Sequence, residues 1–285
     1  MTLRIGEISY TNILPLFYFV DRDKLKEEQF TFIPQVPAQL NAAMSKAEVD
    51  VGGISSFAYA KNQHDYTLLP DLSVSSYHAV GSLFLFSKVP IEQLNEKRIA
   101  LTSSSATTIH LLKVILAHFY QFKVHYEVEE PNYDKMLAQF DACLLIGDDA
   151  IKATWCKEPN IYQYDLGELW YQFTGLPMTF AVIAVRNEIV ETKVKELELL
   201  NRELLFSKEM SIQTQFQPMI RQIMKDHAGD LPFWSNYFNG LTYDFSEAEQ
   251  KGLLSFYDLC YQLGYLNEPV ETLKLWQPVK DKLTK

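Results

Sequence analysis

A turn rich in hydroxyl groups, residues 102–108 (TSSSATT), is the part of the sequence best equipped to bind a ligand. The apolar residues 99–101 before it predict a strand, and the spacing of Ile109, Leu112 and Leu116 after it predicts a helix. The first N–H groups of such a helix, with the positive end of its dipole, can bind a carboxylate or a phosphate. Serine and threonine also cap helices where no ligand binds, and capping alone is the simpler interpretation of this turn.

Three other polar turns occupy the same position between a predicted strand and a predicted helix. They are residues 9–12 (SYTN), residues 52–56 (GGISS) and residues 147–149 (GDD). Ligands of open α/β sheets bind at the carboxyl ends of strands, so four such turns predict a cleft for a small polar anion. In the last turn, Asp148 or Asp149 is expected to cap the helix, although a carboxylate there could also keep anions away.

Strand and helix patterns alternate along the chain, which predicts an α/β fold. We place a linker at residues 89–90 (Val-Pro) and expect the continuously apolar run 180–185 to return the chain to the first lobe. The predicted lobes are therefore 1–88 together with 184–285, and 89–183.

The last third of the chain predicts a helical scaffold. Apolar residues recur at three-and-four spacing in three segments, 189–206, 212–225 and 247–263. A group of aromatic residues is expected to pack against these helices: Trp234, Tyr237, Phe238, Tyr243 and Phe245.

The composition argues against several classes of partner. The 285 residues carry a formal net charge of -10, which disfavours nucleic acid or an anionic membrane surface as the main partner. No apolar run approaches the roughly 20 residues that a membrane-spanning helix needs, and the N-terminal segment lacks the pattern of an export signal. The three cysteines are widely spaced, which suits a reducing compartment, so we expect a cytoplasmic protein.

The sequence also lacks the common motifs for cofactors. It contains no glycine-rich nucleotide loop, no H-E-x-x-H motif and no G-x-S-x-G motif, so we expect neither a nucleotide nor a metal, and no serine hydrolase. Among the six histidines, His78 in a predicted loop is the one that we single out.

A series of short motifs is spread over nearly the whole chain in a fixed order. They are Arg4-Ile5-Gly6, Ile8-Ser9-Tyr10 with Asn12 and Pro15-Leu16, Val80-Gly81-Ser82 with Leu85-Phe86-Ser87, Ile99-Ala100-Leu101-Thr102 with Ser105 and Thr107, Leu145-Ile146-Gly147-Asp148, Asp165-Leu166-Gly167-Glu168 with Trp170, Thr174-Gly175-Leu176-Pro177, and Phe180-Ala181. The series resembles the chorismate dehydratases of the futalosine route to menaquinone. The sister 1,4-dihydroxy-6-naphthoate synthases share the Gly-Leu-Pro segment but usually open with a Ser-Pro-x-Pro-type motif, where this chain has Ser-Tyr-Thr-Asn.

The resemblance implies a two-lobed, periplasmic-binding-protein-like (type II) fold with a ligand cleft between the lobes. It implies conversion of the dicarboxylate chorismate to 3-[(1-carboxyvinyl)oxy]benzoate plus water by a carbon–oxygen lyase (hydro-lyase) without a cofactor. Two alternatives stay open. One is a non-catalytic binding protein for a small carboxylate, which would have the same fold, and the other is the sister synthase.

The resemblance also suggests roles for individual residues. Asn12 and Ser82 are expected to hold a substrate carboxylate that takes the proton, while Ser105 and Thr107 bind the other carboxylate. The remaining predicted contacts are Ser9, Ser55, Ser56, Ser103, Gly147 and Asp148. His78 departs from the family pattern and is a candidate proton donor. The competing interpretations are that Asn12 caps the first helix and that Ser82 is an ordinary strand residue.

Overall fold

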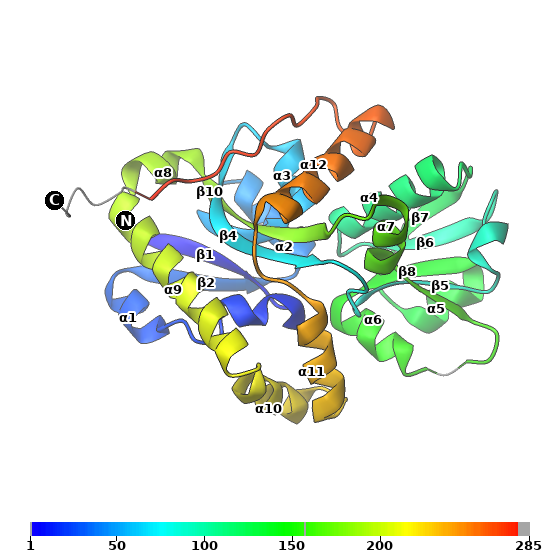
Figure 1. The fold of residues 1–285 in the computed structure, drawn as a ribbon, viewed down its shortest axis with the longest axis horizontal. Helices are drawn as coiled ribbons and strands as arrows, with labels where there is room; N and C mark the ends of the chain where they lie inside the picture. Colours follow the sequence, from blue (N-terminus) through cyan, green and yellow to red (C-terminus); the bar gives the residue numbers. More distant parts are fainter. Residues whose placement is uncertain (1, 157, 279–285) are drawn as a thin grey trace.

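The computed structural model describes residues 2–156 and 158–278, which form two lobes, each built on a five-stranded mixed sheet (Figure 1). The strand order is β2-β1-β3-β10-β4 in the first sheet and β7-β6-β8-β5-β9 in the second. Helices pack against both sheets. The predicted two-lobed α/β fold is therefore confirmed.

The strands of the first sheet are β1 (Leu3–Ile8), β2 (Phe30–Gln35), β3 (Val51–Ser55), β4 (Tyr66–Ser76) and β10 (Met178–Arg186). Here β1 is parallel to both β2 and β3, whereas β10 is antiparallel to β3 and β4. The strands of the second sheet are β5 (Leu83–Ser87), β6 (Arg98–Thr102), β7 (His125–Glu129), β8 (Ala142–Ile146) and β9 (Tyr162–Asp165). In this sheet β6 is parallel to β7 and β8, and β5 is antiparallel to β8 and β9.

Helices follow the strands in each lobe. The first lobe has a 3-10 helix η1 (Thr11–Leu16), α1 (Arg22–Glu27), α2 (Pro37–Ser45) and α3 (Ser56–Lys61). The second lobe has η2 (Ile91–Gln93), α4 (Thr107–Val114) with a π-helical extension η3 (Ile115–Phe119), α5 (Tyr133–Gln139), α6 (Gly147–Thr154) and α7 (Leu166–Thr174). No helix in the described ranges is both long and apolar enough to cross a bilayer.

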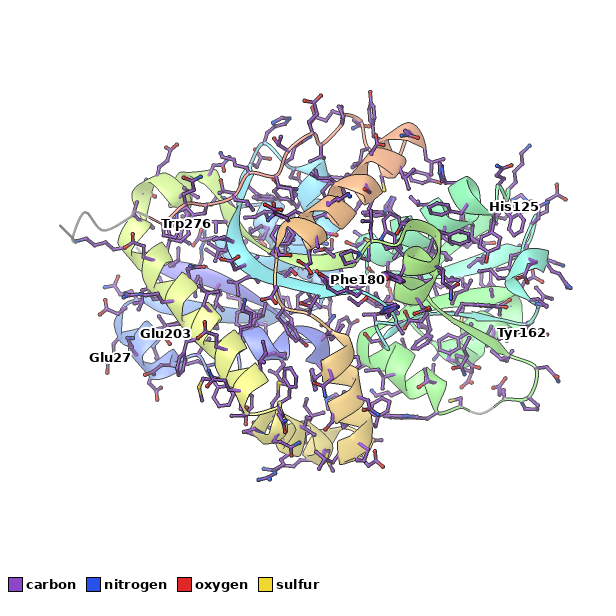
Figure 2. All side chains as sticks on the ribbon, viewed as in Figure 1. Glu27, His125, Tyr162, Phe180, Glu203 and Trp276 are labelled. Carbon is purple, nitrogen blue, oxygen red and sulfur yellow. The ribbon has the colours of Figure 1, made fainter. Side chains whose placement is uncertain are left out.

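The central strands of both sheets are buried along their whole length. Every residue of β3 and β8 is buried, because helices cover both faces of these central strands. Residues of the cores of the two lobes pack into one cluster that runs through the centre of the molecule. Figure 2 shows Phe180 near that centre, where β10 reaches the second lobe.

Two segments carry the chain between the lobes, residues 77–82 from β4 to β5 and residues 175–177 from α7 to β10 (Figure 1). The predicted boundaries, 88/89 and 183/184, divide the chain differently: they separate β5 and the start of β10 from the sheets in which these strands pair. Residues 83–86 and 180–185 are apolar throughout, and a central strand of either sheet has this pattern, so the sequence alone does not assign the two strands to a lobe. We therefore propose boundaries within the two connecting segments.

Asp165 joins the first connecting segment to the start of α7. Its carboxylate accepts hydrogen bonds from the N–H groups of Val80, Gly81, Gly167 and Glu168 at 3.0, 2.7, 2.9 and 3.2 Å. Burial raises the pKa of Asp165, while these N–H donors act in the opposite direction. The carboxylate thus fixes the backbone directly before Ser82.

The C-terminal part consists of α8 (Asn187–Thr192), α9 (Val194–Gln213), α10 (Gln217–Asp226), α11 (Leu231–Gly240) and α12 (Glu247–Gln262). The predicted scaffold is confirmed, and α12 begins with a capping box formed by Ser246 and Glu249. It packs against β10 of the first lobe and α4 of the second. The helix α11 was not predicted, and it lies beside the second lobe near α6 (Figure 1).

Candidate functional site

The turn that follows β1 contacts the turn that begins α6, and this contact joins the two lobes. The Thr11 hydroxyl donates a hydrogen bond to Asp148 Oδ1 at 2.8 Å. The Tyr10 ring lies on the backbone of Gly147, since a Cβ atom there would be 2.9 Å from two ring carbons. The Gly147 N–H in turn donates to the Ser82 carbonyl at 2.7 Å. Three of the sequence-predicted positions, Ser82, Gly147 and Asp148, are thereby brought together.

Gly147 and Asp148 contribute to this contact in different ways, Gly147 through its backbone and Asp148 through its side chain. Gly147 has a φ of +59°, in the left-handed region that favours glycine, and a side chain there would also displace Tyr10. The expectation that Asp148 or Asp149 caps α6 is wrong, because no side chain makes a cap hydrogen bond at this helix. The Asp148 carboxylate instead binds the opposite lobe.

A second group of hydroxyls crosses the lobes beside β10. The Thr107 hydroxyl oxygen accepts a hydrogen bond from the Phe57 N–H at 3.0 Å and lies 3.2 Å from both Ser56 Oγ and the Phe180 carbonyl. Ser56 Oγ donates to the Thr179 carbonyl at 2.8 Å. Ser56 and Thr107, both predicted site residues, are buried, and their hydroxyls contact each other directly.

The hydroxyl-rich turn 102–108 lies between these two groups. Burial raises the pKa of the Tyr10 hydroxyl, and the Ser104 side chain acts in the opposite direction. Ser105 accepts from the Thr108 N–H at 3.1 Å, so the capping interpretation holds for this residue. The first turn of α4 contains no acidic residue, which leaves it suited to an anion. Ser103 points elsewhere, since its hydroxyl donates to the exposed Glu130 carboxylate at 3.1 Å.

Asn12 is half-buried within η1, directly after Thr11. Its side-chain oxygen is buried and has no hydrogen-bond partner among the described residues, and Tyr10 occupies the cap position of η1. The competing interpretation of Asn12 as a helix cap is therefore wrong. Gln35, whose carbonyl accepts from the Ser9 N–H, also has a buried side-chain oxygen without a partner. Buried polar atoms are nearly always paired, and these two lie in or beside the turn that follows β1, so they are candidate contacts for donor groups of a ligand.

Ser82 is fully buried where the first connecting segment enters β5. Its Oγ accepts a hydrogen bond from the Tyr237 hydroxyl of α11 at 3.1 Å. Ser82 is thus more than an ordinary strand residue, because two elements distant in sequence meet at its side chain and its carbonyl.

Ser55 and Ser9 lie at the carboxyl ends of neighbouring strands but have different surroundings. Ser55 is buried and exchanges two hydrogen bonds with the Asn41 side chain, at 2.9 and 3.1 Å. Ser9 is exposed and lines a cavity of about 350 Å³ together with Tyr10, Thr11, Arg22 and His227 among others. This cavity opens beside the turn that holds Asn12.

His78 lies at the surface of the first connecting segment, with 62% of its side chain exposed. Its ring contacts that of Tyr171 with the centroids 4.0 Å apart, and its Nδ1 is 3.6 Å from the Glu168 carboxylate. No described hydrogen bond joins the His78 side chain to the turns between the lobes.

The interlobe site therefore consists of hydroxyls, amides and helix N-termini with few ionisable groups. Its carboxylates are Asp148, Asp149 and Asp165: Asp148 accepts from Thr11, burial raises the pKa of Asp149, and Asp165 accepts from backbone N–H groups. Burial likewise raises the pKa of Tyr10 and of Tyr237, so both hydroxyls stay protonated near neutral pH and can donate hydrogen bonds. Within the described ranges no three His, Cys, Asp or Glu side chains are grouped as metal ligands would be. Such a site can orient a polar substrate and stabilise developing charge.

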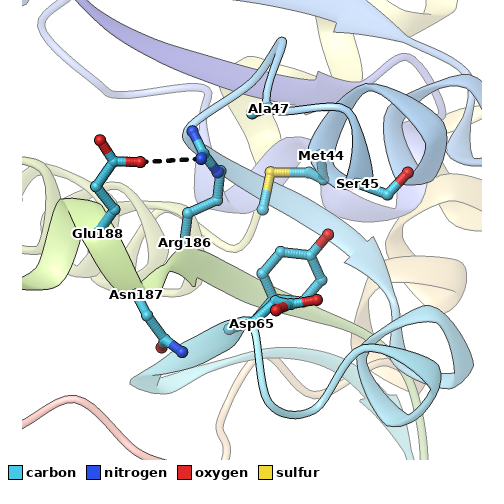
Figure 3. A pocket seen from close by; sticks show the side chains of 8 residues that line it. Met44, Ser45, Ala47, Asp65, Arg186, Asn187 and Glu188 are labelled. Atoms are coloured by element: carbon cyan, nitrogen blue, oxygen red, sulfur yellow. Dashed lines mark hydrogen bonds and ion pairs between the residues drawn. The ribbon is translucent and has the colours of Figure 1, made fainter.

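Another cavity, of about 340 Å³, lies at the far end of β10 and is lined by Met44, Ser45, Ala47, Asp65, Tyr66, Arg186, Asn187 and Glu188 (Figure 3). The Arg186 guanidinium is 3.0 Å from the Glu188 carboxylate and 3.5 Å from that of Asp50. Since acidic side chains already balance this cation, the cavity is a poor site for an anionic substrate.

Sequence reasoning missed two residues of the interlobe site. Thr11 belongs to the polar turn 9–12, but nothing in the sequence distinguishes it from the other residues of that turn. No local pattern indicates that its hydroxyl donates to a carboxylate 137 residues away. Tyr237 was expected to pack in the scaffold, and it does, but its hydroxyl also reaches Ser82. An aromatic residue in a helical pattern shows burial but not the partner of its polar group.

Comparisons with known proteins agree with this architecture. A family model described as menaquinone biosynthesis matches residues 3–262. A chorismate dehydratase of Thermus thermophilus is 37% identical over 198 residues, which are 65% of this chain and 70% of that protein. A chorismate dehydratase of Campylobacter jejuni is 27% identical over 179 residues, 62% of this chain and 64% of that protein, less than two thirds of its length.

The fold also has a close structural counterpart. The periplasmic aliphatic sulphonate binding protein of Escherichia coli superposes with a TM-score of 0.69, although the two are only 14% identical, and the match covers 100% of this chain and 94% of that one. This likeness confirms the expected periplasmic-binding-protein-like fold. Because the family model spans nearly all of the described residues, the chain belongs to the menaquinone biosynthesis family.

Proposed function

We propose that this protein is a chorismate dehydratase of menaquinone biosynthesis, converting chorismate to 3-[(1-carboxyvinyl)oxy]benzoate and water. The sequence shared with the Thermus thermophilus enzyme supports this activity. The observation that carries the proposal is the meeting of the Asn12 turn, Ser82 and the start of α6 between the lobes. We further propose the futalosine route and a cytoplasmic location, for which the three free cysteines are suited.

The reaction makes modest demands on the enzyme. The ring loses its hydroxyl and the neighbouring ring hydrogen, and the electron pair of the broken C–H bond completes the aromatic ring. Hydroxyl and proton leave together as water, so no oxidant, reductant or metal is required by the balance of atoms. Orientation of the dianion and transfer of one proton are the main tasks of the protein.

We assign the proton transfer to a substrate carboxylate that Asn12 and Ser82 hold. The unpartnered atom is the Asn12 side-chain oxygen, which can accept a hydrogen bond from the substrate carboxyl group once that group has taken the proton, while the Asn12 amide N–H groups can donate to the carboxylate. The second carboxylate would bind at the start of α4, near Ser105 and Thr107. The Thr107 hydroxyl already binds the first lobe, so backbone N–H groups of the turn are better placed than this hydroxyl to bind the anion. Ser9, Ser55, Ser56, Ser103, Gly147 and Asp148 stay predicted substrate contacts.

The proposal is tested by mixing purified protein with chorismate alone and following ring aromatisation by ultraviolet absorbance and proton NMR. We expect the enolpyruvyl-oxybenzoate to accumulate without any added cofactor. If chorismate persists but raises the thermal midpoint, the cleft binds a carboxylate without turnover and the protein is a binding protein. If chorismate has neither effect, the sister naphthoate synthase reaction becomes the next to test.

A further inference from the structure

The side chain of Tyr237 packs against Gly81 and Ser82 of the first connecting segment. Tyr237 lies on α11, and only 6% of it is exposed. Its ring packs on the backbone of Gly81, because a Cβ atom added to Gly81 would lie 3.1 Å from the ring. Its hydroxyl donates to Ser82 Oγ at 3.1 Å. One aromatic residue therefore contacts two successive residues of the first connecting segment.

This hydrogen bond determines how the Ser82 hydroxyl can be used. A serine hydroxyl has one proton to donate and two lone pairs to accept with. Tyr237 occupies one lone pair, and no described group accepts the Ser82 proton. The proton is therefore available to a ligand, and rotation of the hydroxyl toward Tyr237 is disfavoured because the tyrosine is the donor.

Hydrogen bonds also fix the backbone on both sides of the Ser82 side chain. The Asp165 carboxylate accepts from the Val80 and Gly81 N–H groups, and the Ser82 carbonyl accepts from Gly147. Rotation of the Ser82 side chain is thus the remaining freedom at this position, and the Tyr237 hydroxyl restricts it.

We propose that Tyr237 is a positioning residue that directs the Ser82 hydroxyl proton toward the substrate. The proposal rests on the chorismate dehydratase function proposed above. It assigns Tyr237 no contact with substrate: the tyrosine acts through Ser82.

Tyr237→Phe removes the hydroxyl but keeps the ring against Gly81, and Tyr243→Phe is the matched control. Tyr243 is also buried in the C-terminal part, but its hydroxyl has no partner among the described residues. We expect Tyr237→Phe to lower kcat about tenfold, as for one hydrogen bond lost at the transition state, with KM within about twofold of the wild type. Tyr243→Phe should match the wild type in both constants.

A mutant cycle with Ser82→Ala separates positioning from a merely structural role. When Ser82 has no hydroxyl, Tyr237→Phe should cause no further loss of kcat, because there is nothing left to orient. An equal loss with and without the Ser82 hydroxyl would overturn the proposal, and so would a wild-type kcat for Tyr237→Phe. Thermal midpoints of all variants show that each is folded. A wild-type protein that does not convert chorismate would overturn the function as well, whereas a fully active Tyr237→Phe overturns the positioning role alone.

Discussion

The Thr11 hydroxyl and the Asp148 carboxylate, 137 residues apart in sequence, form a 2.8 Å hydrogen bond that joins the two lobes. The bond lies next to Asn12 on one side and next to Gly147 on the other. Hydrogen bonds to charged groups contribute about 1.5–3 kcal/mol each, so this contact favours the arrangement of the lobes seen in the structure. Through Asp148 and its neighbour Gly147, the bond connects the turn that contains Asn12 with Ser82, and we therefore expect ligand binding to depend on this contact.

Thr11→Val keeps the shape of the side chain but removes the donor. We expect KM for chorismate to rise about tenfold, because the arrangement of the lobes that the Thr11–Asp148 bond stabilises becomes less populated. The matched control is Thr192→Val, which removes an exposed hydroxyl that donates to the Glu188 carbonyl in α8. Steady-state kinetics check the prediction, and equal KM values for the two variants would contradict it.

Asn12→Ala should lower kcat by about 100-fold, as expected when about two hydrogen bonds to a reacting carboxylate are lost. The thermal midpoint should stay nearly unchanged, because the Asn12 oxygen has no protein partner to lose. The control is Asn201→Ala in α9, where the side-chain oxygen is also buried without a described partner. Asn201 lies in the C-terminal scaffold, so this variant should keep the wild-type kcat. An Asn12→Ala enzyme with the wild-type rate would remove Asn12 from the mechanism.

His78→Gln addresses the candidate proton donor. The histidine side chain is mostly exposed and its nearest ionisable partner is Glu168 at 3.6 Å, so we expect an unaltered pH–rate profile and an unaltered kcat. The profile should be measured over the range in which a histidine titrates, about pH 5–8. Loss of one limb of the profile in the variant would instead establish His78 as the proton donor.

The fold could be predicted from the sequence because the patterns that indicate its strands and turns are local. A continuous apolar run indicated β10, and polar turns after predicted strands, such as 147–149 after β8, marked the edge of each sheet that faces the other lobe. The lobe boundaries were less accessible. The assignment of β5 to the second sheet depends on pairing with β8 and β9, which come later in the chain and leave no trace in its own residues.

The candidate site could be predicted only in part, because its side-chain contacts also join residues far apart in the sequence. The four turns could be recognised one by one, and their meeting followed from the general geometry of α/β sheets. The partner of each side chain did not follow. Asp148 was expected to cap its own helix but binds Thr11, and Tyr237 was expected only to pack but also donates to Ser82. Long-range polar contacts are set by the relative placement of the lobes, which no local pattern encodes.

The contact between His110 of α4 and Phe57 of α3 predicts how lobe packing depends on pH. Their rings stack with the centroids 3.6 Å apart. The His110 Nδ1 lies 2.8 Å from the Ala106 carbonyl, which an N–H at that position satisfies. The pKa of His110 is lowered to about 4, chiefly by burial and to a smaller extent by the nearby Lys113 and Lys61, while the Ala106 carbonyl acts in the opposite direction. The imidazole is therefore neutral at physiological pH.

A histidine whose pKa is lower in the folded than in the unfolded state makes the protein less stable as the pH falls. Between pH 6.5 and about 4 the unfolded chain takes up a proton that the folded chain does not, so His110 should contribute a loss of order 3 kcal/mol across this range. His110→Phe keeps a ring against Phe57 and cannot be charged. We expect the thermal midpoint of the variant to fall less steeply than that of the wild type between pH 6.5 and 4.5. Parallel curves for the two proteins would show that His110 is not the group responsible. His125→Phe, at an exposed position on β7, is the control and should leave the wild-type slope unchanged.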